Sequence, residues 1–391
     1  MKPLEVFVES RVAGGQATST TLRYEGPIRG EVFWEFSGEF LPAAPSDADF
    51  ALVAMLPLCM HRGFDVRVHG SVNRDLLEAV EECMDIWTSC RADLFKRRVE
   101  IVADDYLDQP RPASDRSAVL TFSGGVDATF ALTAHQRAML GRRSTPIAAG
   151  LMVHGFDIPL QHPDWFEKAA THARAIVHEY DTALTSVRTN WREVCVEWTM
   201  SHGFGLFAVL HQFHGRVRGG VIASDYDYFD FQHAWGNNSL SNFFLSGASF
   251  PIRDCGGGYS RTTKVEVIGQ SPAVRKHLRV CWERPELGGN CGTCEKCVRT
   301  QLNFLAAGLG QVPAFPGPLT ASMVKQIGCK NSVQHQLLAG TLKEFPRSNI
   351  PPDIRAAVQQ VLAQPFRRRS LYRAVRERLR LRRWWRLAMA R

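Results

Sequence analysis

The chain has 391 residues, of which 45% are hydrophobic and 22% are charged, as is typical of a soluble globular protein with a sizeable core. Its formal net charge of +8 is concentrated in residues 366–391, which hold eleven Arg and one Glu, so the rest of the chain is close to neutral. No apolar signal segment follows Met1. A charge-free stretch at 300–324 contains prolines, which predict a helix end and a loop rather than a membrane span. We therefore expect a cytoplasmic protein.

Residues 1–117 are predicted to form a separate α+β module. Apolar residues at helical spacing predict one amphipathic helix at about 74–95. No catalytic constellation occurs in this part, so docking, dimerisation or covering the active site are its expected roles. Alternating or β-branched runs predict strands at 6–8, 21–24, 32–36, 66–68 and 99–102.

The most informative segment is 118–129, which reads AVLTFSGGVDAT. Its apolar start predicts a buried strand at 118–122, Ser123, Gly124 and Gly125 predict a tight turn, and a helix is expected from Asp127. Glycines let the backbone approach a ligand closely, and the free N–H groups of a helix N-terminus attract phosphate. The pattern GxxxxGK[ST] is absent, which argues against γ-phosphate chemistry of the P-loop kind. A glycine turn in an ordinary α/β domain is the alternative.

Strands and helices alternate after this segment. The fold class that this alternation predicts is α/β with a doubly wound parallel sheet, whose ligands bind at the carboxyl ends of the strands. The expected helices are 129–138, 165–180 and 197–213, and the expected strands are 148–153, 184–188 and 220–223.

Polar residues follow several of these strands, at 154–157, 189–190 and 224–227, and Asp225 is the strongest candidate among them. Each of these groups, taken alone, is more often a cap or a turn. A glycine-rich loop carries Arg261 and Lys264 ahead of an apolar run at 265–268 that is expected to be a strand. These cations could neutralise a triphosphate, or could simply be exposed to solvent. The loop 235–238 could cover a planar substrate.

Four cysteines are bunched between positions 281 and 297. Cys281 precedes Cys291, Cys294 and Cys297, which form two overlapping CxxC steps. Thiolates at these spacings can close a tetrahedral Zn²⁺ site, and four sulfur ligands leave no position for a catalytic water. Free buried thiols or a redox CxxC are the alternatives, but the clustering and the surrounding glycines favour structural zinc.

In this order the two motifs resemble those of 7-cyano-7-deazaguanine synthase, a family of the PP-loop ATP pyrophosphatase superfamily. The resemblance implies a PP-loop ATP-binding domain at 118–310 with a zinc knuckle at 281–299. It also implies cleavage of ATP between the α and β phosphates, adenylation of a carboxylate-like group of a deazapurine or related heterocycle, and displacement of AMP by a nitrogen nucleophile. The residues that the resemblance places at the nucleotide are Ser123, Gly124, Gly125, Val126 and Thr129 for the phosphates, Asp127 for Mg²⁺ or the loop, and Val153 for adenine. We expect Asp225, Arg261 and Lys264, from their positions, to take part in catalysis.

Three features depart from that family. Ala128 stands where the family has Ser, the loop lies more than a hundred residues into the chain, and the basic tail has no counterpart. A diverged relative with a different acceptor is therefore one interpretation. A tRNA-thiolating PP-loop enzyme that uses Cys255 as its sulfur carrier is another, and a nucleotide-binding scaffold without turnover is a third.

Residues 311–365 are expected to form a C-terminal extension, and 366–391 a basic tail. In the tail Leu371, Val375 and Leu379 recur every four residues, so a helix would carry an apolar stripe flanked by arginines. Such a helix could bind RNA, an anionic membrane surface or an acidic protein. A solvated chain end is the alternative.

Overall fold

The computed structural model describes residues 2–108, 113, 115–228, 234–329, 332–344 and 350–364. The basic tail at 366–391 lies outside these residues. The chain divides into two compact units, Met1–Asn290 and Cys291–Arg391. In the described residues no helix is both long enough and apolar enough to cross a membrane.

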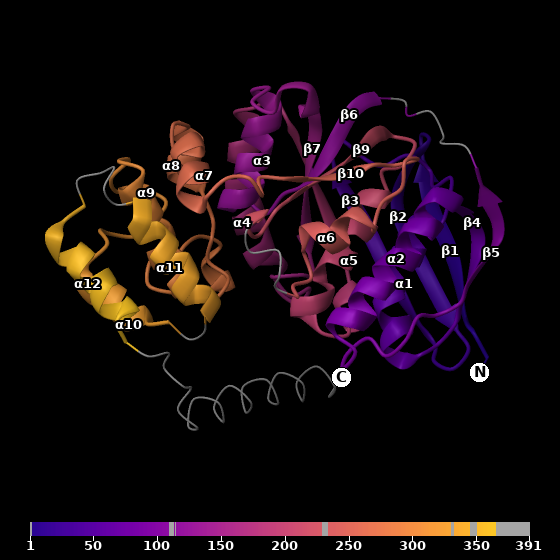
Figure 1. The fold of residues 1–391 in the computed structure, drawn as a ribbon. Coiled ribbons are helices and arrows are strands. Elements are labelled where there is room, and N and C mark those ends of the chain that lie inside the picture. Colours follow the sequence, from indigo (N-terminus) through magenta and orange to yellow (C-terminus); the bar gives the residue numbers. More distant parts are fainter. Residues whose placement is uncertain are drawn as a thin grey trace. The chain divides into compact units, whose positions relative to one another are not determined.

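A ten-stranded sheet forms the centre of the first unit (Figure 1). Its strands are β1 (Leu4–Ala13), β2 (Gln16–Glu25), β3 (Gly30–Gly38), β4 (Val66–Asn73), β5 (Ile101–Leu107), β6 (Asp115–Thr121), β7 (Ile147–His154), β8 (Ala183–Thr189), β9 (Val217–Ala223) and β10 (Ile252–Cys255). Their order across the sheet is β10-β9-β6-β7-β8-β3-β2-β1-β4-β5. Neighbouring strands run parallel except in the pairs β1–β2, β2–β3 and β3–β8. The predicted α/β class with a mostly parallel sheet is confirmed.

The N-terminal strands continue this sheet instead of forming one of their own. β3 pairs antiparallel with β8, and Trp34 lies opposite Thr189. Trp34 is fully buried and packs edge-on against Phe50. One hydrophobic core cluster spans both halves of the sheet. The first compact unit therefore runs through residue 117, where we expected a boundary, and extends to Asn290.

The helices of the first unit are α1 (Asp49–Arg62), α2 (Arg74–Cys90), α3 (Val126–Gln136), α4 (Pro163–His178), α5 (Trp198–His211), α6 (Ser239–Phe243), α7 (Arg261–Ile268) and α8 (Pro272–His277). Figure 1 shows α1, α2 and α5 close together, and their apolar side chains share the large core cluster with the sheet. The amphipathic helix expected at 74–95 is α2. Helix α1 was not predicted, because nearly all of its residues are buried and it lacks the alternation of an amphipathic helix.

The central strands follow a doubly wound order. Helix α3 connects β6 to β7, α4 connects β7 to β8, and α5 returns the chain to β9 on the other side of β6. The direction of winding therefore reverses between β6 and β9. In open α/β sheets such a reversal opens a crevice at the carboxyl ends of the two strands, where ligands bind. The SGG turn follows β6 and Asp225 follows β9, so both lie at this point.

The described part of the second unit is helical. It contains α9 (Glu295–Ala306), α10 (Ala321–Ile327), α11 (Ser332–Glu344) and α12 (Pro352–Leu362). Val298, Leu302, Val324, Leu338 and Val358 belong to its apolar core. Helix α9 ends within the charge-free stretch, and a loop leads to α10, so the predicted helix end and loop are confirmed.

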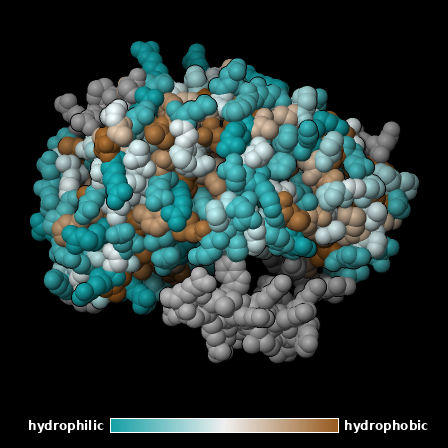
Figure 2. Space-filling model, turned by 180° about the vertical axis from the view of Figure 1, so that it is seen from behind, coloured by the Kyte–Doolittle hydropathy of each residue, from teal (hydrophilic) through white to brown (hydrophobic). Residues whose placement is uncertain are grey.

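The surface of the protein mixes polar and apolar residues. On the face drawn in Figure 2, hydrophobic residues are interspersed with hydrophilic ones. Among the residues that the structure describes, Phe243 and Trp282 are the most exposed of the large hydrophobic side chains, at 72% and 58%.

Candidate functional site

The SGG turn has the backbone geometry of a close-approach loop. β6 ends at Thr121 and α3 begins at Val126, which confirms the predicted strand, turn and helix. Gly124 has φ +72°, a left-handed conformation that favours glycine. The Gly125 N–H donates to Ser123 Oγ at 3.4 Å, and the Arg279 N–H donates to the Gly124 carbonyl at 3.0 Å. The loop is therefore held from two sides.

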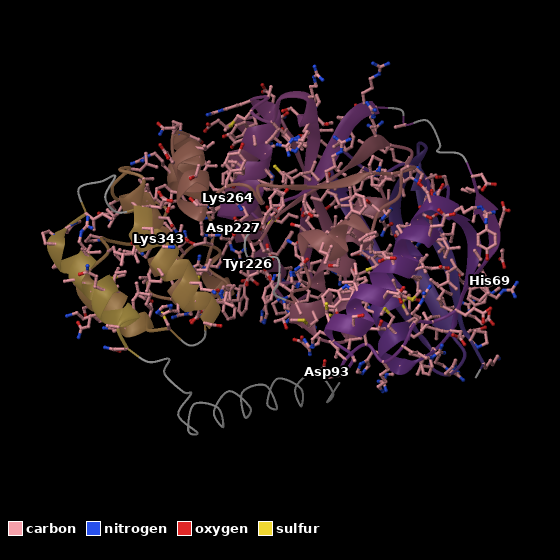
Figure 3. The ribbon with its side chains drawn as sticks, viewed as in Figure 1. His69, Asp93, Tyr226, Asp227, Lys264 and Lys343 are labelled. Atoms are coloured by element: carbon pink, nitrogen blue, oxygen red, sulfur yellow. The ribbon has the colours of Figure 1, made fainter. Side chains whose placement is uncertain are left out.

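Asp127 is paired with both predicted cations. Arg261 Nη1 lies 2.7 Å from one carboxylate oxygen of Asp127, and Lys264 Nζ lies 2.9 Å from the other. The exposed fraction of the side chain is 18% for Asp127, 14% for Arg261 and 3% for Lys264. Lys264 also donates to the Ser224 carbonyl at 3.0 Å, which joins α7 to the segment after β9. Figure 3 shows Lys264 and Asp227 in the same part of the first unit.

The prediction of a strand at 265–268 is wrong. These residues belong to helix α7, which begins at Arg261. The Ser260 side chain caps the helix by accepting from the Thr263 N–H at 3.1 Å, and this cap outweighs the β-branched character of the run. Because residues three apart share one face of a helix, Arg261 and Lys264 both reach Asp127.

Two arginines near the loop keep unused donors. Arg261 Nε and Nη2 are buried and have no hydrogen-bond partner among the described residues. The same is true of Nε and Nη2 of Arg279, a residue that is only 6% exposed. Burial lowers the pKa of Arg279 from its usual value. Unsatisfied donors on a buried cation are costly, and an anion would satisfy them. Sequence reasoning missed Arg279, because it lies in no recognisable motif and only the fold brings its backbone to Gly124.

Asp225 follows the end of β9, but its partners are Trp235 and His202 and not the cations that pair with Asp127. It accepts from Trp235 Nε1 at 2.8 Å, and His202 Nε2 lies 3.5 Å away. Burial opposes its ionisation, yet His202 and Trp235 hold the pKa of Asp225 below its usual range. Asp254 lies nearby, and burial together with the charge of Asp225 raises its pKa to about 6. Two carboxyl groups with opposite pKa shifts therefore lie beside the loop that contains Trp235.

The other predicted residues of this region take part in local structure. Val153 lies in β7 opposite Val187 of β8. Thr129 is fully buried in α3, and its hydroxyl has no partner in the described part of the chain. Asn190 accepts from the Phe33 N–H at 2.9 Å and so joins the end of β8 to β3. The structure thus supports a structural role for Asn190.

A pocket of about 190 Å³ lies near the amino ends of β6, β9 and β10, and Arg142, Arg218 and Arg253 contribute to its lining. None of the predicted site residues lines it. Because the ligands of doubly wound sheets bind at the carboxyl ends of the strands, we assign the candidate site to the SGG loop and not to this pocket.

The four predicted cysteines are brought together. The sulfur atoms of Cys281, Cys291, Cys294 and Cys297 all lie within 4.8 Å of one another, and those of Cys291 and Cys297 are 3.9 Å apart. A tetrahedral zinc with Zn–S bonds of about 2.3 Å places its sulfurs roughly 3.8 Å apart, so the residues fit this metal. The Cys294 N–H donates to Cys291 Sγ at 3.3 Å, as a thiolate ligand would accept. The group could hold a metal ion such as zinc.

Asn290 supports this cluster from just before Cys291. Its side-chain oxygen accepts from the N–H groups of Val280 and Cys281, at 2.8 and 3.1 Å, and its amide donates to the Leu278 carbonyl at 2.7 Å. These bonds fix the turn that presents Cys281. Such outer contacts orient metal ligands.

Comparison with models of protein families, with curated proteins and with solved structures gives no match. The function therefore has to be argued from the site alone.

Proposed function

We propose that the protein is an ATP-dependent enzyme of the PP-loop type. It would adenylate a carboxylate-like group of a small acceptor, a deazapurine or related heterocycle, and release pyrophosphate. A nitrogen nucleophile would then displace AMP. The observation that carries the proposal is the position of Asp127, which follows a glycine turn at the reversal point of the sheet and is paired with Arg261 and Lys264.

The charges around the turn suit a polyphosphate. The N-terminus of α3 and the N–H groups of the SGG turn offer donors to phosphate oxygens. Arg261 and Arg279 have buried donors with no partner among the described residues, which a pyrophosphate could occupy. Bound Mg²⁺ would neutralise phosphate charge, and Asp127 is the residue that would hold it. Arg261 and Lys264 would then stabilise the negative charge on the leaving pyrophosphate.

The cysteine cluster has a structural role in this proposal. Four thiolates complete the coordination of a zinc ion, so no position remains for water or substrate. Zinc would hold the turn that follows Arg279, a residue whose backbone binds the SGG loop. The metal would therefore support the site without entering the reaction.

The setting of Cys255 disfavours the thiolation alternative. A sulfur-carrying cysteine reacts as its thiolate. Burial raises the pKa of Cys255 to about 11, so its thiolate is scarce at neutral pH. Adenylation followed by attack of a nitrogen nucleophile requires no such cysteine.

The test is to incubate the protein with ATP, Mg²⁺, ammonia and candidate 7-deazaguanine acids, and to identify nucleotide and acceptor products by mass spectrometry. We expect AMP and pyrophosphate. Replacing Arg261 or Lys264 by Met should lower turnover about 10²–10³-fold, the usual cost of losing one transition-state donor. Asp164→Asn is the matched control, because Asp164 is an exposed carboxylate in the first turn of helix α4. ADP as the product, or unchanged turnover in both Met variants, would refute the assignment.

A further inference from the structure

A second group of metal-ligating side chains lies inside the first unit. Asp47 precedes α1, Asp49 is the first residue of α1, and His214 follows α5. One ligand atom of each lies within 4.8 Å of the others. Asp49 is fully buried, and the side chains of Asp47 and His214 are each 4% exposed. The group is remote in sequence from the cysteine cluster and shares no residue with the proposed ATP site.

The imidazole of His214 has one partner and one unused nitrogen. Its Nδ1 is paired with Asp47, and 2.7 Å separate Nδ1 from Oδ2. Its Nε2 is also buried, and it has no partner in the described residues.

Two hydrogen bonds from Asn73 orient the carboxylate of Asp49. The N–H of Asn73 donates to one oxygen at 2.9 Å, and the side-chain amide of Asn73 donates to the other at 2.8 Å. A carboxylate has about four lone-pair directions, so two remain for a ligand. Outer-shell bonds of this kind hold metal-binding carboxylates in place.

The charges of the group also call for a cation. Two buried carboxylates, those of Asp47 and Asp49, lie beside the single imidazole of His214. Buried carboxylates are normally paired or bound to a metal ion. A divalent ion would balance both aspartates.

His211 lies one helical turn before His214, outside the group of three ligands. Its Nε2 lies 2.8 Å from the Leu245 carbonyl, which favours the tautomer with the proton on that nitrogen. Its Nδ1 is buried and has no donor among the described residues. Histidines that bind metals commonly donate their other N–H to a backbone carbonyl in this manner.

We propose that Asp47, Asp49 and His214 bind a divalent first-row transition-metal ion in the interior of the first unit. The mixed set of carboxylate and imidazole ligands suits Zn²⁺, Mn²⁺ or Fe²⁺ better than Ca²⁺ or Mg²⁺, which prefer oxygen ligands alone. Because the ligands are closed to solvent, the ion has a structural role. It joins the start of α1, the end of β4 through Asn73, and the end of α5.

The test is a metal count on the full chain without nucleotide. Protein purified from zinc-containing medium is titrated with Mn²⁺, which favours oxygen and imidazole ligands over thiolates. Zinc and iron are measured by mass spectrometry and bound Mn²⁺ by electron paramagnetic resonance. We expect zinc, iron and manganese together to total about two equivalents per chain. Cys294→Ser should lose the ion of the cysteine cluster and keep the ion at Asp47, Asp49 and His214. Asp127→Asn should keep both ions.

His214→Gln and Asp47→Asn should each reduce the total to about one. Asn73→Ala should lower the affinity for the ion at Asp47, Asp49 and His214 about 10–100-fold, the usual cost of losing an outer-shell contact. His135→Gln is the matched control, because His135 is also buried but accepts a backbone N–H at 3.1 Å. A total of one in the wild type would overturn the proposal without any variant. A total of two in a folded His214→Gln or Asp47→Asn protein would also overturn it.

Discussion

Replacing Asp127 by Asn should destabilise the first unit, because Asp127 balances two buried cations. The side chain of Lys264 is 3% exposed and that of Arg261 is 14% exposed, so water cannot compensate their charges. Removing one partner of a buried ion pair costs about 3–5 kcal/mol, since the remaining charge is left without a counter-ion. Asn keeps the shape and one acceptor oxygen, so the lower end, about 3 kcal/mol, is expected.

This cost converts into a measurable shift of the melting temperature. An unfolding entropy of about 2.1 cal/mol/K per residue gives roughly 0.6 kcal/mol/K for the 290 residues of the first unit. A loss of about 3 kcal/mol then lowers Tm by about 5 °C. Calorimetry at neutral pH without nucleotide measures the shift, and Asp164→Asn should leave Tm within about 1 °C.

A double substitution identifies the cause. Asp127→Asn combined with Lys264→Met removes the cation together with its counter-ion, so its cost should be smaller than the sum of the two single costs. Pyrophosphate without magnesium should stabilise Asp127→Asn more than the wild type, because Arg261 and Lys264 are released for the anion. Strictly additive costs, or an unchanged Tm in Asp127→Asn, would refute the reasoning.

Three further predictions concern other parts of the chain. The pKa of Asp254 is raised to about 6, so the stability that its carboxyl contributes is full below about pH 4 and is lost as the pH rises through 6, by up to about 3 kcal/mol. Asp254→Asn should therefore gain thermal stability relative to the wild type between pH 4 and 7. A difference in stability that does not depend on pH would contradict this. Cys294→Ser should lose zinc and stability together in metal analysis and thermal melts, since structural zinc contributes about 10–16 kcal/mol in finger peptides, and a wild type with well under one equivalent would contradict the cysteine site. Deleting residues 366–391 should remove salt-sensitive binding to tRNA and anionic vesicles but spare ATP turnover, and equal binding by the truncated protein at low salt would rule this out.

Local patterns in the sequence predicted most of the central α/β region. The strand, SGG turn and helix at 118–136 were predictable because the apolar run, the glycines and the helix start are contiguous. Helix α1 and strand β10 were missed, since one is apolar on all sides and the other has only four residues. The prediction of a strand at 265–268 was wrong, because the run is apolar and branched like a strand whereas Ser260 caps a helix there.

The site required contacts between segments that are far apart in the chain. Sequence motifs singled out Asp127, Arg261 and Lys264 separately, but only the packing of α3 against α7 shows that they form one ion-pair network. No local pattern marks Arg279. The Asp47, Asp49 and His214 group combines residues from the two halves of the first unit, so no spacing rule could have found it.

The pairing of Asp127 has a consequence for how nucleotide would enter. The carboxylate of Asp127 is paired with the two cations that we propose for the phosphates, so ATP alone would have to compete with Asp127 for them. Magnesium gives the carboxylate another partner and at the same time reduces the phosphate charge that the cations must meet. Nucleotide and magnesium are therefore expected to bind cooperatively, by an exchange of partners at one carboxylate. Asp127→Asn removes the competitor, so this variant should bind pyrophosphate with little dependence on magnesium, whereas wild-type binding should depend on it strongly. Titration calorimetry with and without magnesium measures both, and equal magnesium dependence in the two proteins would show that Asp127 does not control access to the cations.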